Sequence, residues 1–189
     1  MIFAFSTSSR IASVAVFDDA GNVLWAGAQD APQSASSASM ALLNQARLEQ
    51  GIKVENGTLF LADLGPGSFT GVRVGIVLAK TFAFLFGKPC GGLPAFDLVS
   101  VDRTVVLPLK RGEVFVRRPG EEPFPSTVAP PGDFVGYGLP DAEPVYPDAA
   151  RFAGLIDRID RMEAEDLVPK YLIEPSISIP KKRILGVNA

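Results

Sequence analysis

The chain has 189 residues, of which 47% are hydrophobic and 21% charged, and its formal net charge at pH 7 is -3. This composition is sufficient for a folded core, and the acidic balance argues against a protein that binds nucleic acid on its own. Histidine is absent and there is one cysteine, which excludes Ser-His-Asp and Cys-His catalysis, histidine zinc sites and a disulfide framework.

The first half of the sequence predicts an α/β unit. In chain order we expect strands at 2–5, 11–17 and 23–28, a helix at 34–50, a strand at 58–62 and a helix at 70–86. Turn-forming residues at 18–22 join the second and third strands, and Gly51 and Gly87 end the two helices.

The second half is rich in proline and predicts shorter elements. They are strands at 104–107, 113–116, 134–137 and 143–146, followed by a helix at 148–162 with Asp148 as its N-cap. We therefore predict an α/β lobe at 1–102 and a smaller, proline-rich lobe with a final helix and tail at 103–189. The N-terminus lacks a signal-peptide pattern, and charges interrupt the longest apolar stretch. We expect a cytoplasmic protein with no membrane span.

The helix expected at 70–86 has no polar face. Apolar side chains surround it, and its only charges, Arg73 and Lys80, lie on one edge, so it must be covered on more than one side. Small residues at four-residue spacing, which let a second helix approach closely, are Gly71, Gly75, Ala79 and Ala83. The helix at 34–50 offers Ala38, Met40 and Leu42 as a matching face. Either this pair fills the protein's own core or it forms an interface with a partner, which we favour.

A glycine-rich segment, 65–71, joins the strand at 58–62 to this helix. It lacks the Gly-Lys-Ser/Thr of a P-loop, and its glycine spacing differs from the dinucleotide fingerprint. Either it is a tight turn in which Ser68 or Thr70 caps the helix, or its backbone amides contact an anion. The candidate anion contacts are Gly65, Gly67, Ser68 and Thr70.

The segment from Gly65 to Gly75, Gly-Pro-Gly-Ser-Phe-Thr-Gly-Val-Arg-Val-Gly, closely resembles the signature of the bacterial TsaB (YeaZ) family. The resemblance extends over most of the chain. Phe5-Ser6-Thr7-Ser8 is similar to the family's Ile-Asp-Thr-Ser turn, 110–115 to its Arg-Arg-Gly-Glu-Val-Tyr segment, and 169–172 to its Pro-x-Tyr-Leu. It implies an actin-like ATPase (ASKHA, ribonuclease H-like) α/β fold with two lobes, the second of them reduced.

The sequence departs from this family at the turns that line the superfamily's nucleotide cleft. Ser6, next to Thr7, stands where the family has Asp, and Pro108 stands where a second Asp is usual. A hydroxyl and a proline ring do not replace carboxylates at a Mg²⁺ site, so we expect no catalytic residue, no metal site and no cofactor. Asp63 could approach the same cleft, but we interpret it as a solvated loop residue.

The resemblance implies a non-catalytic scaffold subunit in the synthesis of tRNA threonylcarbamoyladenosine (t6A). Its partners would be a TsaD-type protein, in a heterodimer joined through helices, and a TsaE-type ATPase, with tRNA contacted only within the complex. Two alternatives remain: an ASKHA-type nucleotide-binding phosphotransferase, and a diverged TsaB-like protein that acts as a homodimeric interaction module.

Overall fold

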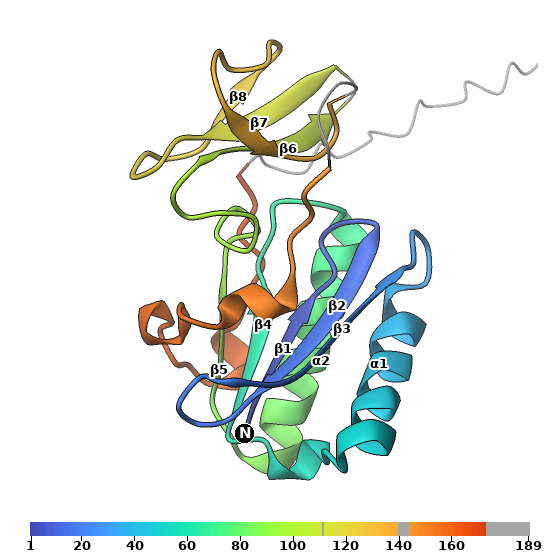
Figure 1. Ribbon diagram of the computed structural model, residues 1–189. Coiled ribbons are helices and arrows are strands. Elements are labelled where there is room, and N and C mark those ends of the chain that lie inside the picture. Colours follow the sequence, from blue (N-terminus) through green and yellow to red (C-terminus); the bar gives the residue numbers. More distant parts are fainter. Residues whose placement is uncertain (111, 140–143, 173–189) are drawn as a thin grey trace, which may run out of the picture.

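The computed structural model describes residues 1–110, 112–139 and 144–172, which form two β-sheets, one above the other in Figure 1. The first sheet has the strand order β3-β2-β1-β4-β5, and the second has the order β8-β7-β6-β9. The strands are β1 (Ile2–Ser6), β2 (Ile11–Phe17), β3 (Val23–Asp30), β4 (Leu59–Asp63), β5 (Cys90–Leu93), β6 (Thr104–Lys110), β7 (Glu113–Arg117), β8 (Phe124–Ser126) and β9 (Phe134–Gly136). The helices are α1 (Ala35–Gln50) and α2 (Phe69–Phe86), with short 3-10 turns η1 (Val54–Asn56), η2 (Ala149–Phe152), η3 (Ile156–Arg158) and η4 (Ala164–Asp166).

The first sheet is built around β1, which is buried at all five positions. Strands β1, β2 and β3 form the antiparallel meander that the sequence predicts, and β4 and β5 extend it in parallel. Alternate residues of β1 serve two cores, with Phe3 and Phe5 on one face and Ile2 and Ala4 on the other. The mixed α/β architecture agrees with the predicted fold class.

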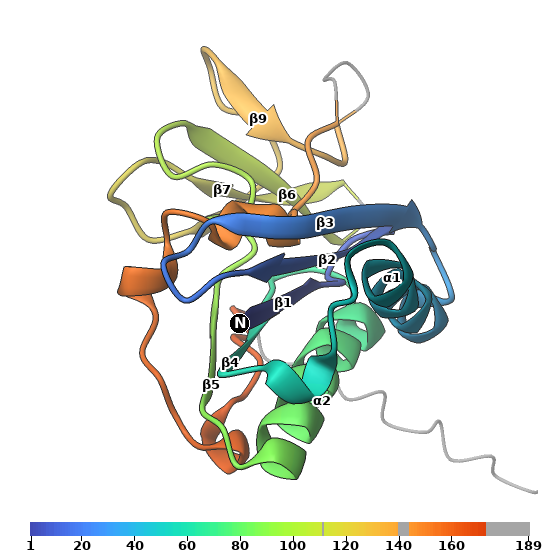
Figure 2. The same cartoon turned by 60° about the horizontal axis from the view of Figure 1, so that its bottom comes forward.

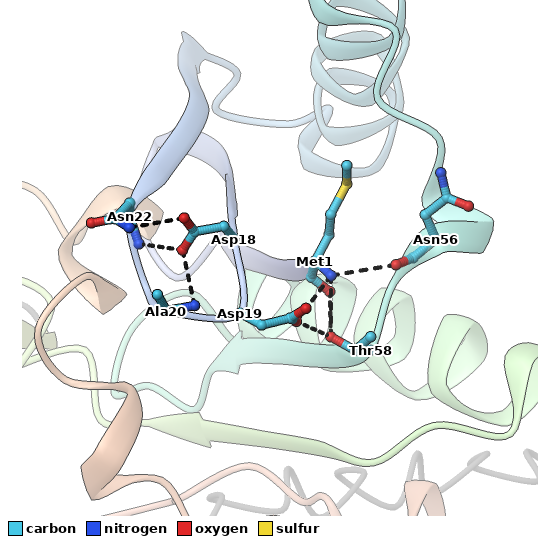
Figure 3. A network of polar contacts seen from close by, with 7 residues as sticks. All are labelled: Met1, Asp18, Asp19, Ala20, Asn22, Asn56 and Thr58. Atoms are coloured by element: carbon cyan, nitrogen blue, oxygen red, sulfur yellow. Dashed lines mark hydrogen bonds and ion pairs between the residues drawn. The ribbon is translucent and has the colours of Figure 1, made fainter.

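The turn between β2 and β3 is fixed by two aspartates (Figure 3). The Asp18 carboxylate accepts hydrogen bonds from the backbone N–H and side-chain amide of Asn22, each at 2.8 Å, which lower its pKa. Asp19 accepts from the Thr58 hydroxyl at 2.7 Å and from the amino group of Met1 at 3.1 Å, and these contacts lower its pKa. The chain start, the turn and the segment before β4 are thereby held together.

Helices α1 and α2 lie side by side on one face of the first sheet (Figure 2). As predicted, both end at a glycine in the left-handed conformation, Gly51 with φ 65° and Gly87 with φ 59°. The Ser68 side chain caps α2 by accepting a hydrogen bond from the Gly71 N–H at 3.2 Å. Helix α2 is long and apolar enough to span a membrane, but one such helix is weak evidence for a membrane protein, because the core helix of a protein packed on a sheet meets the same criterion.

Residues 149–167 pack on the first sheet, whereas the sequence predicted that all of 103–189 belong to the second lobe. Ala149 and Phe152 pack on the face of the sheet opposite the helices, and the Ala149 N–H donates to the Ser13 hydroxyl at 2.9 Å. Met162 exchanges two backbone hydrogen bonds of 2.9 Å with Cys90 of β5. Residues 149–167 therefore belong with the first sheet.

The prediction of an α-helix at 148–162 is wrong. Asp148 caps its first turn as predicted, by accepting from the Ala150 N–H, but only 3-10 turns follow, and Gly154 interrupts them with φ 74°. The buried residues of this segment are spaced by three and four, which suits successive 3-10 turns as well as an α-helix. They are Ala149, Phe152, Leu155 and Ile159.

In the second sheet, the predicted β6–β7 pair and β9 are confirmed. The strand expected at 143–146 is not, because residues 144–146 are irregular and Glu143 lies outside the described residues. Strands β5 and β8 were not predicted. Each is short and contains two glycines or a proline, so neither has the β-branched run that marks a strand.

Candidate functional site

The outer side of α2 carries large apolar side chains that the described residues leave exposed. Phe84 is 84% exposed, and Phe69, Val77 and Leu85 are each about half exposed or more. On α1, Met40 is 49% exposed. We call these five residues the helix face. Their concentration on one layer of the molecule is typical of a protein-binding surface.

Besides a cavity of about 630 Å³ that Phe84 lines at the C-terminal end of α2, two smaller cavities flank the helix face. One, of about 310 Å³, lies at the N-terminal half of α2 and includes Phe69 and Val77 in its wall. The other, of about 330 Å³, lies between α1 and the segment before β4, and Met40, Phe82 and Phe3 are among its lining residues. Both are apolar depressions that suit the side chains of a partner rather than a charged small molecule.

Arg73 is exposed beside Phe69 of the helix face and lines the same cavity at the N-terminal half of α2. Its guanidinium group stacks 3.8 Å above the Phe69 ring, and its Nε donates to the Tyr171 hydroxyl at 3.2 Å. The rings of Phe69 and Tyr171 stack in turn, with centroids 5.8 Å apart. Lys80 differs, because its ammonium donates to the chain's own carbonyl oxygens at Glu165 and Leu167, each at 3.2 Å.

The small residues predicted for the partner interface lie on the opposite side of the helices. Gly71, Gly75, Ala79 and Ala83 of α2 and Ala38 and Leu42 of α1 are all buried against the chain's own sheet. A Cβ atom on Gly75 would lie 2.8 Å from the Thr7 hydroxyl, and one on Gly71 would overlap the Thr7 carbonyl. The small ridge therefore lets α2 approach β1 closely. Of the nine predicted interface residues, Met40 and Arg73 are exposed.

The glycine loop is bound to the turn between β1 and β2. The Ser68 N–H donates to the Ser8 carbonyl at 2.6 Å, and the Gly65 N–H donates to the Asp63 carboxylate at 2.8 Å. A side chain on Gly67 would overlap the backbone of Ser8. Two of the four amides expected to contact an anion are thus already used within the chain, and the tight-turn interpretation is the better one. Thr70 remains exposed.

Asp63 is buried at this point, contrary to the interpretation as a solvated loop residue. It is 1% exposed and accepts hydrogen bonds from the hydroxyls of Ser6, at 2.8 Å, and Ser8. Burial raises the pKa of this carboxyl, although its hydrogen bonds oppose the shift. Strands β1 and β4 run in parallel, so Ser6 and Asp63 lie close together at their C-terminal ends. The contact could have been predicted only by knowing that these two strands pair.

Of the turn residues that the sequence singled out, Ser6 and Thr7 are buried and Pro108 is half-buried. Ser6 and Thr7 are 0% and 1% exposed, and Pro108 pairs with Val114 inside the second sheet. Tyr137 lies in the same region, where burial and then the charge of Asp63 raise its pKa. Among the described residues no group of three Asp, Glu, His or Cys side chains could hold a metal ion.

A smaller cavity, of about 230 Å³, remains between the sheets, lined among others by Gly65, Phe96, Arg117 and Lys170. Arg117 reaches across from β7 to the Asp97 carboxylate and the Ser100 carbonyl, and its ion pair with Asp97 is largely buried. These contacts join the second sheet to the segment that follows β5. Basic and acidic side chains mix in this cavity, so its lining indicates no single ligand class.

Solved structures with the same arrangement come from Pseudomonas aeruginosa. A protein described as uncharacterised with similarity to the peptidase YeaZ superposes with a TM-score of 0.77, at 20% identity, over 91% of this chain and 99% of the other. YeaZ of the same organism gives 0.73, at 21% identity, over 90% and 99%. The chain has the YeaZ fold. The predicted resemblance and two-lobed fold class are confirmed at this level.

Sequence comparisons cover less of this YeaZ-like chain. Residues 29–100, from the end of β3 to just beyond β5, match the family model for TsaD, tRNA N6-adenosine threonylcarbamoyltransferase. An uncharacterised protein of Mycobacterium leprae is 31% identical over 134 residues, which are 59% of this chain. The match spans 36% of that relative's length.

Proposed function

We propose that this YeaZ-like chain is a non-catalytic scaffold subunit in t6A biosynthesis and that it pairs with a TsaD-type protein. The YeaZ fold and the match of residues 29–100 to the TsaD family model support the pathway. A TsaE-type ATPase is the further partner, tRNA is contacted within the complex, and the assembly is cytoplasmic.

The observation that carries the proposal is the helix face. Phe84 is 84% exposed on a helix whose opposite side is buried, and burying a phenylalanine side chain contributes roughly 1.5–3 kcal/mol. Val77 and Phe84 are seven residues apart and so lie on the same side of α2. A partner helix laid along this side would cover both, which fits the helix-to-helix contact that the family resemblance implies.

The burial of Ser6, Thr7 and Asp63 supports the non-catalytic part of the proposal. An ASKHA-type phosphotransferase needs open carboxylates at the strand ends, but Asp63 is buried and bonded to Ser6 and Ser8. The Ser68 amide at the start of α2 is bonded to the chain as well. Calorimetric titration with Mg-ATP tests this point, and binding in the micromolar range would favour the phosphotransferase alternative.

The pairing is tested by light scattering on mixtures with the TsaD-type protein of the same genome. Val77→Asp places a charge on the helix face, and Val128→Asp is its matched control because Val128 is 71% exposed on the second lobe. We expect a heterodimer for the wild type and for the control, and separate monomers for Val77→Asp. A wild-type chain that forms no complex, or a complex that survives both Val77→Asp and Phe84→Asp, would contradict the proposal.

A further inference from the structure

Arg73 of α2 has a guanidinium group that is held in place but only partly used. The group lies 3.8 Å from the centre of the Phe69 ring, and its Nε donates to the Tyr171 hydroxyl at 3.2 Å. These contacts use the face of the group and one of its five N–H donors. Within residues 1–110, 112–139 and 144–172, no acceptor bonds to its two terminal nitrogens and no carboxylate forms an ion pair with it. The four N–H groups on those nitrogens can therefore bind an acceptor from another molecule.

The other two cations of the helix layer are bonded within the chain. Helices α1 and α2 carry Arg47, Arg73 and Lys80 as their basic residues. The Arg47 guanidinium group donates to the Asn44 side chain at 3.0 Å, and the Lys80 ammonium donates to two backbone carbonyl oxygens. Among the described residues, Arg73 is thus the one cation of these helices that keeps both terminal nitrogens free while its side chain is fixed.

The cavity of about 310 Å³ beside Arg73 suits an anionic side chain with an apolar stem. Its remaining lining residues are apolar or carry a hydroxyl group: Ser36, Phe69, Thr70, Val74, Val77 and Leu78. No aspartate or glutamate lines it, and neither helix has an acidic residue in its first turn. The first turns of both helices contribute to its wall, and a helix N-terminus carries partial positive charge. The charge of this cavity is therefore complementary to a carboxylate.

We propose that Arg73 binds a carboxylate of the TsaD-type partner, from an aspartate or glutamate side chain that enters this cavity when the partner covers the helix face. The terminal nitrogens of an arginine match the two oxygens of a carboxylate, so the contact is a two-pronged ion pair. Phe69 and Val77 belong both to the helix face and to this cavity, so a partner helix on that face brings its side chains within reach of Arg73. The ion pair rests on the proposed function and adds the chemistry of the partner's contact residue.

Tyr171 acts in this contact as a positioning residue. Its ring stacks on Phe69 with centroids 5.8 Å apart, and the backbone N–H of the preceding Lys170 donates to the Leu64 carbonyl at 2.9 Å. Tyr171 is thus anchored to the first sheet, and its hydroxyl holds the Arg73 side chain before the partner arrives. A side chain that is already ordered loses less entropy on binding. Removal of the Tyr171 hydroxyl is therefore expected to weaken binding only through Arg73.

Titration calorimetry of the full chain with the TsaD-type protein of the same genome, at low and at physiological salt, tests the ion pair. Arg73→Gln removes the charge, and Arg151→Gln is its matched control because Arg151 is exposed in η2, on the face of the first sheet opposite the helices. We expect Arg73→Gln to weaken binding by at least about tenfold and to reduce its dependence on salt, and the control to bind as the wild type does. Tyr171→Phe is expected to weaken binding about threefold in the wild type and not at all in Arg73→Gln.

Crosslinking with a carbodiimide identifies the partner's residue. The reagent joins an amine to a carboxylate that it touches, with formation of an amide, so Arg73→Lys supplies a reactive group at this position. Arg151→Lys is the matched control. We expect mass spectrometry of the heterodimer to show position 73 joined to an aspartate or glutamate of the partner, and no such product at position 151.

Failure of this ion pair and failure of the proposed pairing are distinguishable. A wild-type chain that forms no heterodimer contradicts the proposed function, and the ion pair fails with it. A heterodimer that forms as tightly with Arg73→Gln as with the wild type, or that gives no crosslink from position 73, overturns the ion pair alone. A crosslink from position 73 to a second copy of this chain, in place of the partner, overturns it as well.

Discussion

The two sides of α2 differ in a way that reverses the usual arrangement of a surface helix. Its sheet-facing side is lined largely by glycine and alanine, which bring the helix backbone against β1. Its outer side carries phenylalanine, leucine and valine in exposed positions. On the sheet-facing side, the close packing of α2 against β1 stabilises the fold. On the outer side, the exposed apolar area remains available for a partner. Substitutions on the two sides are therefore expected to affect different properties.

The largest effect is expected where a charge enters the sheet-facing side. Ala79 is 0% exposed, so Ala79→Glu buries a carboxylate without a partner and is expected to lower the free energy of unfolding by about 4 kcal/mol. Thr81→Glu places the same charge on the outer side and is expected to change stability by less than about 0.5 kcal/mol. Urea denaturation of both variants measures the difference, and equal losses would contradict the assignment of the two sides.

A smaller loss of unfolding free energy is expected when the hydrogen bonds that Asp63 makes beside the glycine loop are removed. Asp63→Ala removes the acceptor for the hydroxyls of Ser6 and Ser8 and for the Gly65 N–H. Buried donors left without a partner are expected to cost about 2 kcal/mol of unfolding free energy. Denaturation at pH 6 tests this value, and an unchanged midpoint would show that the cluster does not hold the loop.

The same carboxyl predicts a pH dependence. Burial raises its pKa in the folded state, so the stability that the protonated form contributes is complete below the unfolded pKa, about 3.9, and is lost as the pH rises through the folded pKa. Relative to Asp63→Asn, the wild type is expected to lose stability as the pH rises from about 4. Denaturation of both proteins across this range tests the sign, and a difference that does not change with pH would contradict it.

The cap at the start of α2 is expected to contribute less. The Ser68 hydroxyl accepts from the Gly71 N–H at 3.2 Å, and Ser68→Ala is expected to cost about 1 kcal/mol. Ser68→Asn, which retains an acceptor, serves as the control and is expected to stay near wild-type stability. Thermal unfolding followed by circular dichroism is sufficient for this comparison.

The smallest stability effect belongs to the outer side. Val77 is 57% exposed, so Val77→Asp is expected to change the free energy of unfolding by no more than about 0.5 kcal/mol. The same variant is expected to abolish binding of the TsaD-type protein. A large loss of stability would mean that this position is covered within the chain itself, and it would remove the distinction between the two sides.

The sequence predicted features that depend on neighbouring residues. The ends of both helices were predicted correctly because Gly51, Gly87 and Ser68 act on their own helix. The meander was predicted because its strands are joined by a turn whose chemistry lies in five consecutive residues. In these cases the residues that determine the structure are close together in the chain, so one segment is enough.

Features that depend on distant segments were predicted poorly. The spacing of Gly71 and Gly75 shows that they share a side of the helix, but it does not show that β1 covers that side. The burial of Asp63 follows from its position beside Ser6 across two parallel strands. By contrast, Gly154, with φ 74°, is a local signal inside the segment that the prediction of a helix at 148–162 missed.

The return of residues 149–167 to the first sheet has a consequence for the synthesis of the chain. One face of that sheet is covered by η2 and the residues after it, and the hydrogen bond from Ala149 to Ser13 spans 136 positions in sequence. Contacts of this separation close a long loop and form slowly. During translation, the apolar face of the sheet therefore stays uncovered until nearly the whole described chain has emerged from the ribosome. A chaperone that shields nascent apolar surface would act on this face during that interval.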